Sequence, residues 1–356
     1  MKTKKKIMVV AGGSGGHIFP AVAFCQGIQE RYDGVAECVL VTNTGPKNKA
    51  ADKFLPGALA SFDLRASKSP AGIWGLAIRS LYSFFRFSPD VVVGFGGFCT
   101  VPLVLLGRLC GRRVFIHEQN VLPGRANRFL SAFVHKIFIT FPDTQAYVKR
   151  HMAKVQLVSF PLRRSIERTD KAEALHFFGL NENYFTVLVV GGSQGARVLN
   201  KKFLEALRQN QHADRFQVIH LCGSADEEML TNAYREAGIR SKVIAFLEQM
   251  HYAYSAADLV VGRAGAGAVM EIMRLGLAAL LVPYPHAGGH QRENAKFLAQ
   301  KGAALFVEED KLAPGLINGL LDIFIDDQMR RTTMSRLAVS LFQAMGKTTL
   351  SEAVMS

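Results

Sequence analysis

Short apolar runs alternate with longer stretches of helical periodicity in both halves of the chain. The runs are rich in valine, isoleucine and leucine, and glycine or polar residues follow most of them. Near-continuous apolar runs separated by helices are typical of parallel strands that are covered on both faces. The pattern predicts an α/β fold with two doubly wound, Rossmann-like domains. The predicted strands are 7–11, 38–42, 91–95, 114–118 and 136–140 in the first half, and 186–190, 217–221, 242–246, 258–262 and 278–283 in the second.

The predicted domain boundary follows the stretch VQLVSFP, where apolar periodicity gives way to LRRSIERTDK. We place an N-terminal domain at 1–162 and a C-terminal domain at 163–340. Residues 341–356 have helical spacing and are expected to pack back on the N-terminal domain. Ligands of doubly wound sheets collect at the carboxyl ends of the strands, so the loops at those ends are expected to carry the chemistry.

The segment 71–87 departs from this rhythm and holds the only tryptophan of the chain. Arg79 and Arg86 fall on one helical face, and the apolar side chains spread over a broad arc. The segment is too short and too charged to span a bilayer. It is either a core helix or an interfacial helix whose aromatic side chains enter lipid beside basic ones, and we expect part of the arc to serve each role. The candidate membrane residues are Ile73, Trp74, Leu81, Phe84 and Phe85.

Charge is distributed unevenly along the chain. The net charge is +14, and residues 1–160 hold 21 Lys and Arg against 8 Asp and Glu, whereas the remainder is nearly balanced. A basic half suggests a polyanionic partner, unless the charge is simply a solvated surface. Nucleic acid is disfavoured because no recognition motif is present, which leaves an anionic membrane surface.

The five cysteines have no C-x-x-C spacing, and the apolar run after the first lysines is too short for a signal peptide, so we expect a cytoplasmic protein.

Two glycine loops have the same form. GGSGGHIFPA begins at Gly12 and GGSQGARVLN begins at Gly191, and each follows a predicted strand and opens a helix. Small residues let a ligand approach the backbone, and amide N–H groups at a helix start attract anions, so both loops are candidate phosphate cradles. In the first loop Ile18 stands at the third glycine position of a dinucleotide fingerprint, and no acidic residue ends the next strand; a Walker loop is excluded because no G-K-[ST] follows. His17, one residue past the first loop, is a candidate general base because an imidazole can accept a hydroxyl proton near neutral pH.

Four further stretches carry candidate recognition groups. Gly94, Gly96 and Gly97 lie at the end of the predicted strand 91–95, and the sequence HEQN at 117–120 lies at the end of the next one. Four consecutive polar side chains at a strand end suit a hydroxyl-rich ligand. In the second half, the sequence GRAGAGAVMEIMRLG forms a small-residue loop and a helix start that could face a diphosphate, with Glu271 placed for ribose hydroxyls. Gln291 and Asn294 open another helix.

Metal and acyl-transfer chemistry find little support in the sequence. Two glycines separate His286 from His290, and HEQN lacks the second histidine of H-E-x-x-H. No G-x-S-x-G elbow is present. We expect no protein-bound metal and no other cofactor.

Six motifs in this order resemble those of the bacterial peptidoglycan N-acetylglucosaminyltransferases, the MurG family. They are GGSGGHIFPA, VVGFGGF, HEQNVLPGRANR, VVGGSQGARVLN, AYSAADLVVGRAGA and HQRENA, and they cover nearly the whole chain. The resemblance implies a GT-B fold with the active site in a cleft between two domains. It also implies transfer of N-acetylglucosamine from UDP-N-acetylglucosamine (UDP-GlcNAc) to the C4 hydroxyl of the N-acetylmuramoyl unit of lipid I, with inversion, to give lipid II. The second domain would bind the donor and the first would receive the acceptor.

The resemblance also implies roles for particular residues, with His17 as the base that deprotonates the acceptor hydroxyl. The residues implied to position the acceptor are Gly96, Gly97, Phe98 and Glu118. The resemblance further implies a peripheral protein on the cytoplasmic face of the inner membrane. Other proteins of wall synthesis are possible partners there. The implied donor-binding residues are Ser14, Gly15, Gly16, Asn120, Arg163, Ser193, Leu247, Ala266, Gly267, Ala268, Val269, Met270, Glu271 and Gln291.

Two positions depart from the family pattern. Phe160 stands where an asparagine is usual before the Pro-x-Arg turn, and Ala268 stands where a threonine is usual at the helix start. Both departures bear on donor affinity. Two alternative functions stay open at this point, a UDP-sugar 2-epimerase of the same architecture and a noncatalytic nucleotide-sugar sensor. The basic, aromatic segment 71–87 speaks against the epimerase, which needs no lipid.

Overall fold

The computed structural model describes residues 4–43, 60–64, 69–163, 166–192 and 195–356. Contacts divide the chain into two compact units. Unit 1 comprises Met1–Arg163 and Met345–Ser356, and unit 2 comprises Arg164–Ala344. The boundaries expected from the sequence, after residues 162 and 340, lie within four residues of these.

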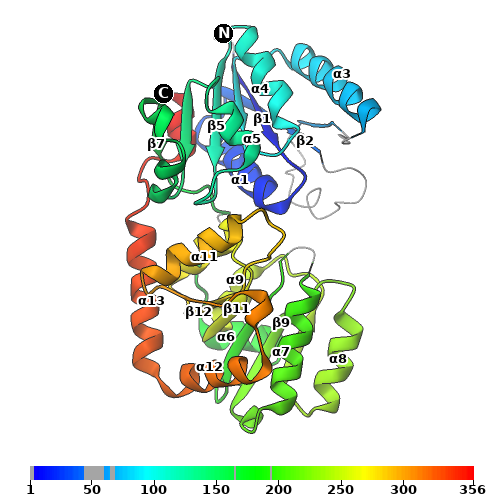
Figure 1. Cartoon of the computed structure of the whole chain (residues 1–356), viewed down its shortest axis with the longest axis vertical. Coiled ribbons are helices and arrows are strands. Elements are labelled where there is room, and N and C mark those ends of the chain that lie inside the picture. Colours follow the sequence, from blue (N-terminus) through cyan, green and yellow to red (C-terminus); the bar gives the residue numbers. More distant parts are fainter. Residues whose placement is uncertain (1–3, 44–59, 65–68, 164–165, 193–194) are drawn as a thin grey trace. The chain divides into compact units, whose positions relative to one another are not determined.

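Unit 1 is built on a seven-stranded parallel sheet in the order β3-β2-β1-β4-β5-β6-β7 (Figure 1). The five strands predicted for this half are confirmed, and β3 and β7 are additional strands at the two edges. Ile7 of β1 pairs with Cys38 on one side and Val91 on the other, so the register is fixed in the middle of the sheet. The strands are β1 (Lys5–Ala11), β2 (Ala36–Thr42), β3 (Ala60–Asp63), β4 (Val91–Gly94), β5 (Arg113–Glu118), β6 (Lys136–Ile139) and β7 (Val155–Leu157).

Alternate residues of β1 show how helices cover both faces of this sheet. Ile7 and Val9 belong to a core that includes side chains of α1 and α14, whereas Met8 and Val10 belong to a second core with side chains of α3 and α4. All four side chains are fully buried. Burial on both faces explains why the strands appear in the sequence as unbroken apolar runs. The helices of unit 1 are α1 (Gly15–Arg31), α3 (Pro70–Phe87), α4 (Thr100–Leu109), α5 (Arg125–Leu130) and α14 (Leu350–Met355), with 3₁₀ turns η1 (Pro142–Tyr147) and η2 (Lys149–Lys154).

The last residues of the chain return to unit 1 and complete its core. Thr349 caps α14 in a reciprocal capping box with Glu352. The same Glu352 pairs with Arg31 of α1 at 2.6 Å. Leu350 and Val354 are buried against the α1 face of the sheet. The C-terminal helix is therefore an integral part of unit 1.

Unit 2 repeats the plan with a six-stranded parallel sheet in the order β10-β9-β8-β11-β12-β13. The five strands predicted for this half are confirmed, and β13 is an additional edge strand. A core on one face packs side chains of α7, α8 and α12 against the sheet. The strands are β8 (Phe185–Val190), β9 (Phe216–Leu221), β10 (Ser241–Ile244), β11 (Leu259–Gly262), β12 (Ala279–Leu281) and β13 (Leu305–Phe306).

The helices of unit 2 follow the strands in the alternating rhythm that the sequence predicts. Asp170 caps the first of them, and Gly276 in left-handed conformation ends α10. They are α6 (Lys171–Phe178), α7 (Arg197–Gln209), α8 (Glu227–Glu236), α9 (Met250–Ala256), α10 (Ala266–Leu275), α11 (His290–Gln300), α12 (Pro314–Asp326) and α13 (Gln328–Gln343), with 3₁₀ turns η3 (Ala213–Arg215) and η4 (Glu309–Lys311).

Each sheet has one point where the strand order reverses. In unit 1 it lies between β1 and β4, and in unit 2 between β8 and β11. Connections leave to opposite sides there, which opens a crevice at the carboxyl ends of the two strands. The glycine loops that follow these four strands are therefore the first places to examine for a ligand site.

Candidate functional site

His17 lies at the point of strand reversal in unit 1. It belongs to the first turn of α1, directly after the loop that follows β1, and its side chain is half-buried. Its Nδ1 atom is 3.1 Å from the hydroxyl oxygen of Ser14, the residue that precedes the helix. Ser14 thereby orients the ring while part of the imidazole remains accessible.

Glycines enclose the His17 ring. A Cβ atom on Gly96 would lie 3.1 Å from Nε2 of His17, and one on Gly12 would lie 3.0 Å from Nδ1. Gly96 and Gly97 have φ values of +96° and +91°, which side chains disfavour. The N–H of Gly12 donates to the carbonyl of Gly96 at 2.8 Å and ties the two loops together. The absence of side chains at these positions makes room for the imidazole.

Glu118, at the end of β5, organises the next loop from within. It is 2% exposed, and its carboxylate accepts four hydrogen bonds. Two come from the backbone and side-chain nitrogens of Asn120 (3.0 and 3.1 Å), one from the N–H of Gly124 (2.9 Å) and one from Nδ2 of Asn127 (2.8 Å). The geometry shows that Glu118 orders the loop 120–127, and its predicted part in positioning the acceptor stays a prediction.

The neighbours of Glu118 are also interior groups, which corrects the expectation that all four HEQN side chains face a ligand. His117 and Gln119 have no exposed surface, whereas Asn120 is half-buried. Burial lowers the pKa of His117 to about 3, so the ring is neutral. Phe160, the departure from the family turn, packs with its ring centroid 6.4 Å from that of His117. Among these side chains, Asn120 is the one that reaches the surface.

The remaining predicted residues of unit 1 differ in their exposure. Gly15 and Gly16 form the start of α1. Phe98 is 51% exposed beside Gly97. The guanidinium of Arg163 lies over the ring of Phe19, 5.5 Å from its centroid. Arg163 thus belongs to unit 1, whereas the predicted boundary assigned it to the C-terminal domain.

In unit 2, glycine makes the corresponding close approach between loops. A Cβ on Gly195 would lie 2.4 Å from the carbonyl oxygen of Cys222, and Gly195 has a φ of +75°. Gly195 therefore packs closely against the loop after β9. Ser193, the predicted diphosphate contact after β8, lies outside the described residues. Leu247, in the loop after β10, is half-buried.

The start of α10 presents backbone to the surface. Positions Gly265 and Gly267 have open space where a side chain would be. Ala266 and Ala268 complete a first turn made only of small residues. Val269 and Met270 are fully buried, so their side chains belong to the core, and their assignment as donor contacts stays a prediction. What this helix offers a ligand is its free N–H groups.

Glu271 and Gln291 each have a partner within the protein. The carboxylate of Glu271, 9% exposed, accepts a hydrogen bond from the hydroxyl of Tyr254 at 2.7 Å. The side-chain oxygen of Gln291 accepts from the N–H of Tyr284 at 2.9 Å. The burial of Glu271 therefore does not by itself require a ligand, because Tyr254 compensates part of it.

Sequence reasoning missed Arg263, which holds the loops around α10 in place. It is 8% exposed and donates to the carbonyls of Val282 (3.1 Å) and Pro283 (3.3 Å), and it pairs with Glu309. Asn294, which is fully buried, donates to the carbonyl of Ala264 at 3.1 Å. An arginine at a strand end was a visible signal, but nothing in the sequence indicates its partners.

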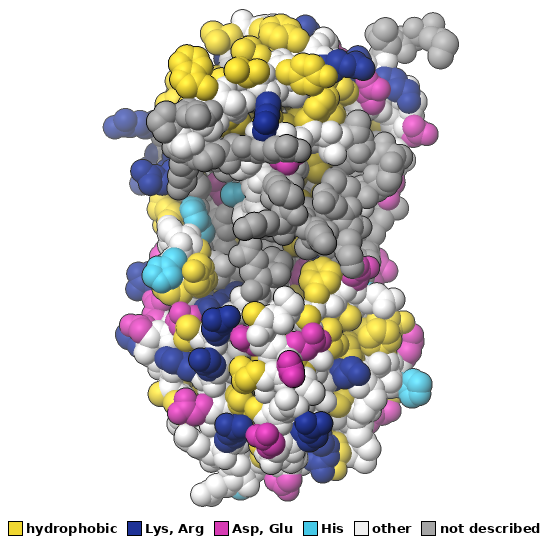
Figure 2. Space-filling model, turned by 90° about the vertical axis from the view of Figure 1, so that its right-hand side faces the viewer, with side chains coloured by type: hydrophobic (Ala, Val, Ile, Leu, Met, Phe, Trp, Pro, Cys, Tyr) yellow, Lys and Arg dark blue, Asp and Glu magenta, His cyan; other side chains and the backbone are white. Residues whose placement is uncertain are grey.

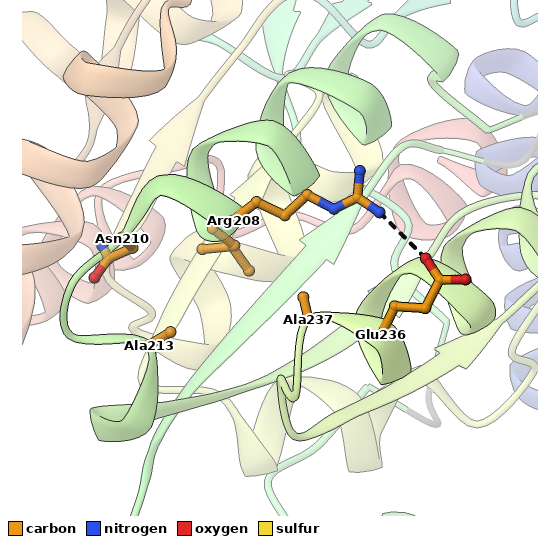
Figure 3. Close-up of a pocket in the computed structure, with 6 residues that line it drawn as sticks. Arg208, Asn210, Ala213, Glu236 and Ala237 are labelled. Carbon is orange, nitrogen blue, oxygen red and sulfur yellow. Dashed lines mark ion pairs between the residues drawn. The ribbon is translucent and has the colours of Figure 1, made fainter.

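A separate hollow of about 330 Å³ lies in unit 2 at the amino ends of the strands, opposite the glycine loops (Figure 3). Leu207 and Arg208 at the end of α7 line it together with Glu236 at the end of α8, and the guanidinium and carboxylate are 3.7 Å apart. Helices of a parallel sheet run opposite to the strands, so their ends lie away from the glycine loops. This hollow is not part of the candidate site.

Helix α3 divides its apolar side chains between core and surface. Phe84 is 2% exposed and packs in the core with Leu76, so its assignment to the membrane face is wrong. The other four predicted residues are exposed, Trp74 by 74%. Figure 2 shows hydrophobic side chains gathered with lysine and arginine on the surface of unit 1. The exposed apolar side chains of α3 are Ile73, Trp74, Ile78, Leu81, Tyr82 and Phe85.

Crossing a bilayer requires a helix that is both long enough and apolar enough. No helix in the part of the chain that the structure describes meets both conditions.

Comparison with known proteins matches both units to one family. The glycosyltransferase family 28 N-terminal domain matches residues 7–139, and the family 28 C-terminal domain matches residues 186–349. Together they cover most of the chain. The parallel α/β architecture of the two units is that of the GT-B fold.

Relatives with assigned names are similar over nearly their whole length. The UDP-N-acetylglucosamine–N-acetylmuramyl-(pentapeptide) pyrophosphoryl-undecaprenol N-acetylglucosamine transferase of Halothermothrix orenii is 32% identical over 97% of both chains. The enzyme of the same name from Coxiella burnetii is 34% identical over 94% of both chains. The crystal structure of Acinetobacter baumannii MurG has a TM-score of 0.72 and 27% identity, covering 97% of this chain and 96% of that one. The chain thus belongs to the MurG family of N-acetylglucosaminyltransferases.

Proposed function

We propose that the protein transfers N-acetylglucosamine from UDP-GlcNAc to the C4 hydroxyl of the N-acetylmuramoyl unit of lipid I, which yields lipid II and UDP. The observation that carries the proposal is the placement of His17, held by Ser14 and enclosed by glycines at the strand reversal of unit 1. Family membership supports this reaction over the 2-epimerase and the noncatalytic sensor.

In the proposed reaction His17 acts as the general base. The acceptor oxygen attacks the anomeric carbon of the donor while the bond from that carbon to the UDP oxygen breaks, and the configuration inverts. The imidazole takes the hydroxyl proton as the new bond forms, which avoids a protonated ether intermediate. The Ser14 hydroxyl, 3.1 Å from Nδ1, supports the orientation of the ring. Asn120 and the exposed ring of Phe98 are the proposed substrate contacts beside it.

The departing UDP requires stabilisation of its developing negative charge. The free N–H groups at the start of α10 are suited to a diphosphate. Arg163 supplies a cation, and Glu271 supplies acceptor oxygens for ribose hydroxyls. We propose that these groups stabilise the leaving group without a protein-bound metal.

A labelled-donor assay tests the reaction directly. Purified protein is incubated with radiolabelled UDP-GlcNAc and a short-chain lipid I analogue, with and without a chelator. We expect label in the lipid product under both conditions. An epimerised UDP-sugar without lipid product would indicate the epimerase, and donor binding without turnover would indicate the sensor. Loss of transfer on chelation would overturn the metal-free part of the proposal.

We further propose that unit 1 binds the cytoplasmic face of the plasma membrane through α3. The exposed side chains of Trp74 and Phe85 have the amphipathic setting of an interfacial helix, and the exposed Arg86 follows Phe85 in the chain. The excess of basic residues in the first half of the chain supports attraction to anionic lipid. This placement would bring the lipid-linked acceptor to the unit that carries His17.

Replacing Trp74 and Phe85 by serine should weaken binding to anionic vesicles by about tenfold or more, because two large exposed apolar side chains no longer enter the lipid. Vesicle sedimentation measures the binding, and activity on a detergent-soluble acceptor should stay near that of the parent. Met329→Ser, which removes an 80% exposed apolar side chain of unit 2, is the matched control. Equal vesicle binding by the double variant would show that α3 is not the membrane surface.

A further inference from the structure

A tyrosine of α9 and a glutamate of α10 meet in the interior of unit 2. The hydroxyl of Tyr254 donates to Oε2 of Glu271 at 2.7 Å, and Tyr254 is only 2% exposed. The neighbours of Glu271 along α10, Met270 and Ile272, are almost completely buried. A carboxylate in such an apolar setting costs free energy even when it accepts hydrogen bonds, whereas a phenylalanine and an apolar partner would fill the same space without that cost. The pair therefore favours a role beyond packing.

The tyrosine is presented from a helix that is tied to the rest of unit 2. Within α9, the hydroxyl oxygen of Ser255 accepts a hydrogen bond from the N–H of Thr169 at 2.9 Å. Just after the helix, the carboxylate of Asp258 accepts from the N–H of Thr186 in β8, also at 2.9 Å. Since the ring of Tyr254 is enclosed as well, its hydroxyl has little freedom of position. It can hold a glutamate carboxylate in one orientation, which the long glutamate side chain would not keep by itself.

Glu271 belongs to the helix whose start is suited to a diphosphate. It follows Ala266, the first residue of α10, by five positions, which corresponds to about 7.5 Å along the helix axis. In a nucleoside diphosphate, the ribose hydroxyls are separated from the phosphates by a length of the same order. Both oxygens of a carboxylate can accept hydrogen bonds, so one carboxylate suits two adjacent hydroxyls, and Tyr254 fixes the direction of the pair through Oε2.

We propose that Tyr254 is a positioning residue that makes the donor site selective for ribose over 2′-deoxyribose. Its hydroxyl holds the carboxylate of Glu271 in the orientation that accepts from the 2′- and 3′-hydroxyls of the nucleotide. The inference rests on the proposed function, which assigns the ribose hydroxyls to Glu271. A nucleotide without the 2′-hydroxyl cannot make one of these bonds to the carboxylate, and sites built around such a bond reject the analogue that lacks it.

Calorimetric titrations with UDP and with 2′-deoxy-UDP test this selectivity, because the two nucleotides differ only in the 2′-hydroxyl. The parent should bind UDP about tenfold or more tightly than 2′-deoxy-UDP. Tyr254→Phe keeps the ring and loses the hydroxyl, so it should weaken UDP binding by about tenfold and 2′-deoxy-UDP binding by less than about threefold. The KM for UDP-GlcNAc should rise with the UDP dissociation constant, while the acceptor KM stays unchanged.

Tyr252→Phe is the matched control, because Tyr252 lies on the same helix and its hydroxyl also donates to a glutamate, Glu173, at 3.2 Å. This variant should bind both nucleotides as the parent does. A second pair of variants shows whether Tyr254 acts through Glu271. Glu271→Gln should reduce the preference for UDP by itself, and adding Tyr254→Phe to it should change UDP affinity by less than about twofold, because the carboxylate to be oriented is already absent.

The ratio of the two affinities separates positioning from a general loss of packing, which would weaken both nucleotides alike. Calorimetry also gives the fraction of each preparation that binds, so incomplete folding does not change the dissociation constants. A Tyr254→Phe variant that keeps the parental ratio would overturn the inference, as would a parent that binds both nucleotides equally. A parent that discriminates between the nucleotides but transfers no sugar would contradict the transferase assignment and still support the inference.

Discussion

The His17→Ala variant is expected to turn over on the order of 10²-fold more slowly than the parent, because the attacking hydroxyl loses its general base. The donor KM and the UDP affinity should change little, since the donor is assigned mainly to the loops of unit 2. Steady-state kinetics with labelled UDP-GlcNAc and a soluble acceptor measure the turnover, and calorimetry measures the UDP affinity.

His151→Ala, a half-buried histidine of unit 1 outside the glycine loops, serves as the control and should retain parental turnover. An unchanged rate in His17→Ala would remove this residue from proton transfer. A loss of UDP affinity as large as the loss of rate would instead make it a binding residue.

Acid is expected to destabilise both units strongly through their buried neutral histidines. Burial lowers the pKa of His117 in unit 1 and of His220 in unit 2 to about 3, against an ordinary value of 6.5. Between pH 3 and pH 6.5 each of these imidazoles is protonated in the unfolded chain but neutral in the folded chain. The free energy of unfolding is therefore highest above pH 6.5 and decreases as the pH falls below that value. Each histidine should lower the free energy of unfolding by about 2 kcal/mol at pH 5, out of the roughly 5–15 kcal/mol typical of a domain.

Urea unfolding at pH 7 and pH 5 measures this effect. The variant His220→Gln should lose the acid sensitivity that His220 contributes to unit 2, because glutamine does not titrate, while the contribution of His117 remains. An unfolding free energy that falls equally between the two pH values in parent and variant would contradict the assignment to His220.

The sequence was sufficient to predict the interior strands of both sheets and the edge strand β10, but not the edge strands β3, β7 and β13. Strands such as β1 and β8 are buried on both faces and appear as continuous apolar runs. The edge strands β7 and β13 are only two or three residues long and half-buried, so they contain no run to detect. Helix α3 was predicted nearly to its ends, and its division between core and surface followed from its wide apolar arc.

Within the candidate site, the sequence showed residue types but not their burial. The glycines around His17 were recognisable because a close approach restricts the backbone to glycine. Glu118 and His117 were harder to interpret, because a polar side chain at a strand end can face either a ligand or the loop that it organises. His220 could not be recognised from the sequence because it lies within an apolar run, and its hydrogen-bond partners, Tyr234 of α8 and Asn200 of α7, come from two other elements.

The chain crosses between the two units twice, because Met345–Ser356 belongs with the first 163 residues. During synthesis on the ribosome, the strands of unit 1 are made early, but the core between its sheet and α1 stays incomplete until Leu350 and Val354 are made. Unit 2, by contrast, is contiguous, and all its residues are made before Met345–Ser356. We therefore expect nascent unit 1 to depend longest on chaperones, although its residues are made first.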